Sequence, residues 1–180
     1  GISEAPVTLG SAEPEVLEAS GLVLENYQEA LRRFPYQTLS KTNRLTYDIL
    51  QLYLQNQLSG QKFALYAEPL GPTIGTQAQL PVLLAEYAFR NKADIETYLT
   101  LLTEMDEYYS TLVHFEEAKS REGLFMSASA AQAVIDQCNA FIREPSKNFL
   151  ITVFAEKIEE VDFLTQVEKK HFLEQNEKAV

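Results

Sequence analysis

Apolar residues recur every three or four positions along most of this 180-residue chain, which is the spacing of amphipathic α-helices. Alternation of apolar and polar residues, the mark of a half-buried strand, is nearly absent, and no Asn-Gly or Asp-Gly hairpin turn occurs. The sequence therefore predicts an all-α fold, an irregular bundle of about seven or eight helices with no significant sheet. The expected helices cover residues 14–34, 41–67, 81–88, 92–104, 106–122, 127–143, 149–161 and 165–180.

Polar residues in capping positions mark the starts of several of these helices. Ser40, Asn91 and Ser127 are placed to cap helix N-termini, and Thr165 opens a capping box for the last helix. That last helix runs to Val180 with no Gly, Pro or Asn to close it. We therefore expect residues 1–180 to be a single helical domain that is the N-terminal fragment of a longer protein.

Two stretches lack helical signals. Residues 1–11 read as an extended N-terminal segment, and residues 68–79 hold two prolines and two glycines, which predicts a Pro/Gly loop. Loops on a rigid helical scaffold often carry function. The candidate substrate-binding residues are therefore Gly75, Gln77 and Gln79, because the two glutamine amides suit a peptide backbone. In the alternative interpretation the loop is a connector, and its glutamines cap the helix that follows.

Composition and charge narrow the classes of partner. Apolar residues make up 46% of the chain and charged residues 23%, which is enough for a core and argues against disorder. The formal net charge of −11 repels phosphate backbones and anionic membrane surfaces, so we expect no nucleic-acid partner. No apolar run is long enough to predict a membrane span.

Side chains suited to metal binding or nucleophilic catalysis are few. The histidines are His114 and His171 and the cysteine is Cys138, so the His-Glu-x-x-His zinc motif cannot be formed. Glu168 lies three residues before His171 on one helical face, but a solvated pair is favoured over a metal site, as it is for His114 with Glu117. Cys138 sits in an apolar helical pattern and is expected in the core. We expect no catalytic residue, metal ligand or cofactor in this chain.

Several short segments occur in a recognisable order along the chain. They are Leu-Thr-Tyr-Asp-Ile-Leu at 45–50, Tyr-Leu-Gln-Asn-Gln at 53–57, Gly-Thr-Gln-Ala-Gln-Leu-Pro at 75–81, Asp-Ile-Glu-Thr-Tyr-Leu at 94–99, Gly-Leu-Phe-Met at 123–126, Ile-Asp-Gln-Cys at 135–138 and Asn-Phe-Leu-Ile-Thr-Val-Phe at 148–154. In this order and spacing they resemble the N-terminal region of the domain-of-unknown-function 885 family, whose members are described as bacterial lipoproteins or exported proteins. The resemblance covers nearly the whole chain.

Full-length members of this family are much longer and resemble helical zinc metallopeptidases. The resemblance implies that this chain is a non-catalytic N-terminal scaffold or substrate-cleft portion of an exported, secreted or cell-envelope-attached bacterial protein. Its partners would be the C-terminal catalytic-like half of the same protein, which would hold any zinc, and a peptide substrate. The alternative is a free-standing helical module that binds a protein or peptide, and a metal- or ligand-binding bundle ranks third.

A chain that shares a core with a second half keeps apolar side chains that have no internal partner. We expect such faces around Phe172 in the last helix and on the helix over residues 81–88. The apolar side chains of that helix cannot all point one way: Val82, Leu83, Leu84 and Tyr87. Homodimerisation through these exposed apolar faces is an expected by-product, because identical faces can pair about a two-fold axis.

Overall fold

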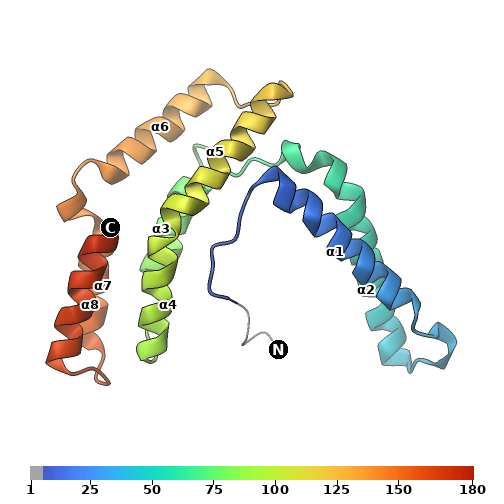
Figure 1. Cartoon of the computed structure of the whole chain (residues 1–180), viewed down its shortest axis with the longest axis horizontal. Coiled ribbons are helices and arrows are strands. Elements are labelled where there is room, and N and C mark those ends of the chain that lie inside the picture. Colours follow the sequence, from blue (N-terminus) through green and yellow to red (C-terminus); the bar gives the residue numbers. More distant parts are fainter. Residues whose placement is uncertain (1–5) are drawn as a thin grey trace. The chain divides into compact units, whose positions relative to one another are not determined.

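The computed structural model describes residues 6–180, and these residues form eight α-helices and no strand (Figure 1). The all-α prediction is confirmed. Of the extended segment expected over residues 1–11, residues 6–11 have no regular secondary structure, and residues 1–5 lie outside the described part. The α-helices are α1 (Pro14–Arg32), α2 (Lys41–Gly60), α3 (Thr76–Ala85), α4 (Lys92–Thr103), α5 (Met105–Arg121), α6 (Ala128–Ile142), α7 (Phe149–Glu160) and α8 (Gln166–Ala179), with 3₁₀ helices η2 (Tyr36–Thr38), η3 (Gln61–Tyr66) and η4 (Pro145–Lys147).

These residues divide into two compact units. Unit 1 comprises residues 6–10, 68–110 and 126–180, and unit 2 comprises residues 11–67 and 111–125. The division passes through α5, so that the first part of this helix belongs to unit 1 and the rest to unit 2. Each unit has its own buried side chains.

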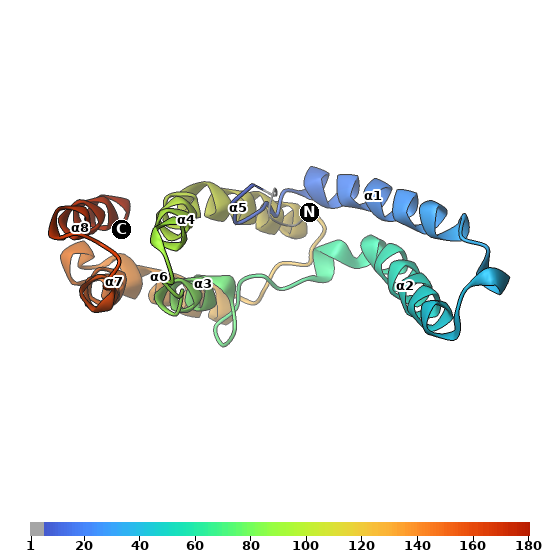
Figure 2. The same ribbon diagram turned by 90° about the horizontal axis from the view of Figure 1, so that it is seen from below.

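Unit 1 has an aromatic and aliphatic core supplied mainly by α3, α4, α7 and α8. Helix α7 packs against α3 and α8, α4 packs against α8, and α3 also contacts α6 (Figure 2). Tyr98 stacks on Phe154 with ring centroids 5.2 Å apart, and Phe89 meets both rings edge to face at 5.4 Å. The buried members of the core are Leu84, Ile95, Tyr98, Leu102, Leu150, Phe154, Ile158, Leu164 and Phe172.

The exposed apolar faces expected on α3 and α8 are present only in part. Val82 and Leu83 are 48% and 63% exposed, as expected, whereas Leu84 and Phe172 are each 3% exposed and belong to the core. The expectation is wrong for Leu84 and Phe172. Sequence periodicity identifies an apolar face but not the element that covers it. Helices α7 and α4 supply that cover within unit 1.

Helix α3 begins earlier than the sequence predicts. The non-helical stretch expected over residues 68–79 ends at Gly75, and α3 starts at Thr76 with Pro81 buried in its interior. Proline is favoured in the first turn of a helix because it lacks an N–H group, and that preference places the predicted start too late. Gly75 is the N-cap instead, and its carbonyl accepts the N–H of Gln79 at 3.1 Å.

The predicted caps of the other helices are confirmed by side-chain hydrogen bonds. Helix α2 is nevertheless shorter than the expected span of residues 41–67, because the chain passes into η3 after Gly60. The side-chain caps accept backbone N–H groups as follows: Ser40 from Asn43, Asn91 from Asp94, Ser127 from Ala130 and Thr165 from Glu168, the last completing a capping box.

Unit 2 is built on a hairpin in which α1 and α2 lie side by side (Figure 1). Within these two helices only Gly21 and Leu54 are buried. The part of α5 in unit 2 contributes the remaining buried side chains, among them Phe115 and Lys119, whose Nζ donates to the carbonyl of Ala67 at 2.7 Å. The hairpin therefore buries little of its own apolar surface.

Candidate functional site

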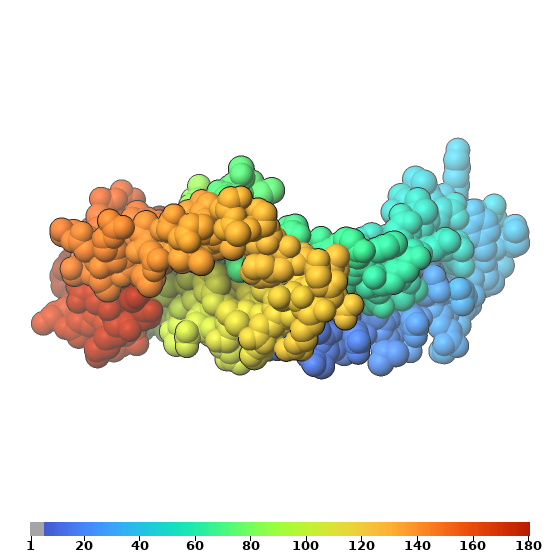
Figure 3. Space-filling view, turned by 90° about the horizontal axis from the view of Figure 1, so that it is seen from above, coloured from blue at the N-terminus to red at the C-terminus, as the bar shows by residue number. Residues whose placement is uncertain are grey.

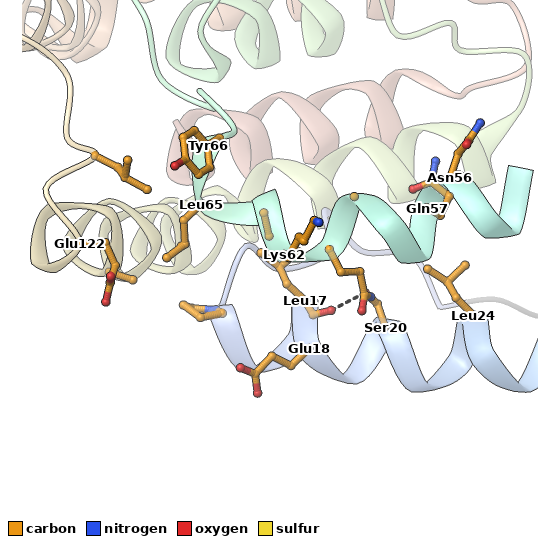
Figure 4. Close-up of a pocket in the computed structure, with 16 residues that line it drawn as sticks. Leu17, Glu18, Ser20, Leu24, Asn56, Gln57, Lys62, Leu65, Tyr66 and Glu122 are labelled. Carbon is orange, nitrogen blue, oxygen red and sulfur yellow. Dashed lines mark hydrogen bonds between the residues drawn. The ribbon is translucent and has the colours of Figure 1, made fainter.

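A groove of about 850 Å³ lies in unit 2 between α1, the end of α2, η3 and the end of α5 (Figure 4). Its apolar lining includes Leu17 and Leu24 from α1 and Leu65 from η3. This volume falls within the range of sites that bind small molecules or short peptide segments. The groove is the candidate functional site of unit 2.

The polar lining of the groove is rich in amides and acidic overall. Asn56 and Gln57 come from the last turns of α2, and each amide offers both donors and an acceptor. Glu18 and Glu122 are the acidic lining residues and Lys62 is the basic one (Figure 4). Such a lining can hydrogen-bond both the N–H and C=O groups of a peptide. None of the lining residues is His or Cys, so the groove supplies no nucleophile–imidazole pair.

Gly21 determines how closely α1 approaches η3 beside the groove. A Cβ atom at this position would lie 2.2 Å from Oε1 of Gln61, so the Gln61 side chain occupies the space that any larger residue would fill. Glycine inside a helix costs about 1 kcal/mol relative to alanine. Sequence reasoning misses the groove residues, and this glycine within a helical pattern is the one signal that points towards them.

A histidine–carboxylate pair joins the start of α1 to α5 within unit 2. Nδ1 of His114 lies 2.5 Å from Oε1 of Glu13. The hydrogen bond to Glu13, together with its charge, raises the pKa of His114 above the ordinary value. Glu117, the partner expected from the sequence, forms an ion pair with Arg121 at 3.3 Å.

We expect Glu13→Gln to lower the pKa of His114 towards the ordinary value of about 6.5. Because the pKa of the folded state is the raised one, the pair stabilises the fold fully below about pH 6.5 and loses this contribution as the pH rises through the raised value. NMR titration of the imidazole resonances measures the shift. Glu15→Gln, which removes a weaker and purely electrostatic influence, should lower the pKa less. An equal effect of the two substitutions would contradict the assignment.

The structure separates the three predicted substrate-binding residues. Gln77 is buried, and its Nε2 donates to the carbonyl of Gly71 at 2.6 Å and to Oε1 of Gln137 at 2.8 Å. Gln79 is exposed on α3, whereas Gly75 is buried at the N-cap. The backbone of the preceding loop and the Gln77 side chain therefore lie close to Gly75. Among the three residues, only Gln79 presents its side chain to solvent.

Paired glutamine amides fix the loop that precedes α3. Gln137 of α6 accepts from Gln77 and donates from Nε2 to the carbonyl of Pro72 at 2.8 Å. A Cβ atom on Gly75 would lie 2.3 Å from the backbone nitrogen of Gly71, so the loop closes on itself without room for a side chain. Through these contacts Gly75 and Gln77 stabilise the conformation of the loop. Peptide binding by Gly75, Gln77 and Gln79 stays a prediction.

The side chains considered for metal chemistry do not assemble into a ligand set. Within residues 6–180, no group of three or more His, Cys, Asp or Glu side chains is placed to hold a metal ion. Glu168 accepts hydrogen bonds from the backbone and side chain of Thr165 and from Nζ of Lys92 at 3.1 Å. These bonds lower the pKa of Glu168 to about 2. Glu168 thus takes part in the capping of α8 and forms an ion pair with α4. His171 is exposed beside it.

Cys138 is exposed, and its expected place in the core is wrong. Only Val134 of α6 is buried, and the space-filling view shows this helix, coloured orange, lying open along one face (Figure 3). An apolar helical pattern is therefore insufficient to predict that the thiol is buried in the core. Partial burial raises the pKa of the Cys138 thiol, which disfavours the reactive thiolate.

No helix in the described part of the chain combines the length and the apolar character needed to cross a lipid bilayer.

Comparisons with known proteins establish the fold and the family. The crystal structure of a protein described as "the putative lipoprotein from Colwellia psychrerythraea" matches 95% of this chain with a TM-score of 0.80 at 15% sequence identity. The matched region is 31% of that protein, so this chain spans less than a third of its length. No curated protein matches the chain significantly. The sequence profile described as "Bacterial protein of unknown function (DUF885)" matches residues 5–180. The chain therefore belongs to the DUF885 family of bacterial proteins.

Proposed function

We propose that this chain is the non-catalytic N-terminal helical scaffold of a longer, exported protein related to zinc peptidases, and that its groove forms part of the substrate cleft. The Colwellia protein supports the first half of this proposal, because there the same fold occupies 31% of a longer chain that is described as a lipoprotein. By analogy, the parent of this chain would be attached to the bacterial cell envelope.

The observation that carries the cleft role is the amide-rich groove of unit 2. A peptide backbone presents alternating donors and acceptors, and the amides of Asn56, Gln57 and Gln61 can satisfy both kinds. The leucines that line the groove can receive an apolar side chain of the substrate. The residues described here do not supply a zinc ligand set. Any zinc and the hydrolytic groups would therefore belong to another part of the parent protein.

The test is peptide hydrolysis by the full-length parent protein loaded with zinc. We expect Gln57→Ala to raise KM about three- to tenfold while kcat changes less than about twofold, because the groove binds substrate away from the reacting bond. Gln55→Ala is the matched control, since Gln55 is exposed on the same helix but does not line the groove. Absence of hydrolysis with any peptide in a library would refute the peptidase relationship, and equal KM values for the two variants would refute the cleft role.

A free-standing peptide-binding module is the second candidate. It is favoured by one observation: residues of unit 2 alone line the groove, so no further part of a protein is required to form it. Fluorescence anisotropy with labelled peptides discriminates the two candidates. A module should bind a peptide as tightly in the isolated chain as in the parent, whereas a cleft portion should bind measurably only when the remainder of the parent is present.

A further inference from the structure

The outer face of α2 carries a row of large apolar side chains, which we call the α2 stripe: Leu45, Ile49, Leu52 and Tyr53. Their exposed fractions are 61%, 58%, 59% and 55%. The spacing of i, i+4, i+7 and i+8 places all four on one side of the helix. The sequence pattern therefore identifies a genuine apolar face, but the described residues leave it uncovered.

This stripe faces away from the helix that α2 already contacts. Leu54, the buried residue of α2, follows Leu45 by two and a half helical turns and so lies on the opposite side. That opposite side packs against α1. Because α1 occupies one side of α2, the stripe on the other side has room for a separate packing partner. Helix α2 is thus apolar on two sides, and only the side that holds Leu54 is covered.

The chemistry of the stripe fits another helix. Its four side chains are uncharged, and charge occurs only at its borders, where Lys41 precedes it and Asp48 accepts a hydrogen bond from Tyr36. Residues at this spacing form a ridge that fits the groove between side chains of a neighbouring helix. Four exposed side chains of this size in one row are more than the scattered apolar residues of a monomer surface and are typical of an interface.

The net charge of the chain disfavours two other partners for the α2 stripe. At −11 per chain, two copies would bring together a doubled negative charge, and an anionic membrane surface would repel the chain. The matched fold forms only 31% of the Colwellia chain, so that protein has further polypeptide beyond this fold. We take such a further segment as the partner of the stripe.

We infer that the α2 stripe is the surface on which an amphipathic helix from the remainder of the same protein packs. This inference rests on the proposed function for the existence of a longer parent, but it does not depend on peptidase activity. Exposed apolar side chains thus occur on α2, where the sequence prediction did not place them, as well as at Val82 and Leu83 of α3.

Cysteine accessibility tests the inference directly. In a Cys138→Ser background, Ile49→Cys places a thiol in the stripe, and Gln51→Cys places one on the other side of the same helix, at another exposed position. In the chain of residues 1–180, both thiols should react with maleimide at similar rates, since both positions are exposed. In the full-length parent, the thiol at position 49 should react at least about tenfold more slowly, because reaction then requires local opening. The thiol at position 51 should keep its rate.

Each other outcome overturns the inference in a distinct way. Equal rates at position 49 in the two proteins would mean that the parent leaves the stripe open. Protection in the 180-residue chain that grows with concentration would identify a second copy, and protection at every concentration would identify cover from within the chain. Protection only with phosphatidylglycerol vesicles would identify a membrane surface. Protection in a parent that hydrolyses no peptide would refute the peptidase proposal and leave the docking surface intact.

Discussion

Replacing Phe154 by alanine is expected to lower the free energy of unfolding of unit 1 by about 3–5 kcal/mol, the usual cost of truncating a buried phenylalanine. Phe154 is 2% exposed and stacks on Tyr98, while Phe89 meets its ring edge to face. Truncation therefore removes both the buried apolar area and the aromatic contacts, and leaves a cavity between α4 and α7. Urea denaturation followed by circular dichroism measures the loss.

Phe163→Ala is the matched control, because this phenylalanine lies in unit 1 but is 40% exposed. Its truncation should cost no more than about 1 kcal/mol, as for most partly exposed positions. Similar losses for the two variants would mean that the Phe154 cluster is not the centre of the unit 1 core.

The second large effect is expected at Gly75. Gly75→Ala should destabilise unit 1 by about 1–3 kcal/mol, the range for an added group that has no space. A Cβ atom there would lie 2.3 Å from the nitrogen and 2.6 Å from the oxygen of Gly71, and backbone cannot move aside as a flexible side chain can. Hydrogen exchange of the amides in α3 reports the loss locally.

Gly71→Ala provides the matched comparison in the same loop. A Cβ atom on Gly71 would meet nothing within 4 Å, so this variant should change stability by less than about 0.5 kcal/mol. If Gly75→Ala also left stability unchanged, the conclusion that the loop has no room for a side chain at this position would be wrong. The predicted role of Gly75 in substrate binding would then regain weight over its structural one.

Local rules predicted most of the helices because their signals reside in neighbouring residues. A serine, threonine or asparagine side chain reaches an N–H group two or three residues ahead, so caps such as Ser40 and Thr165 can be read without knowing the fold. The start of α3 could not be predicted from such local signals. Gly75 caps that helix without a side chain, and the packing of buried Pro81 holds a proline where local preference disfavours it.

The placement of apolar faces depended on contacts between distant segments and was less predictable. The stripe of α2 consists of large apolar side chains and is exposed, whereas the buried face of α8 holds Lys169 and Asn176 beside Phe172. Periodicity contains no information about which helix arrives to cover a face. The groove was missed for the same reason, because its lining comes from α1, α2, η3 and α5, and none of these contributes a motif alone.

The two compact units also limit how the chain can be dissected genetically. Unit 2 is assembled from residues 11–67 and 111–125, so no single truncation point releases it intact from unit 1. A deletion of residues 11–67 would strip the cover from Phe115 and would remove the carbonyl of Ala67, to which Lys119 donates. Loss of function after such a deletion would therefore report the disruption of α5 as well as the absence of the hairpin. Mapping an activity to either unit therefore requires point substitutions within that unit.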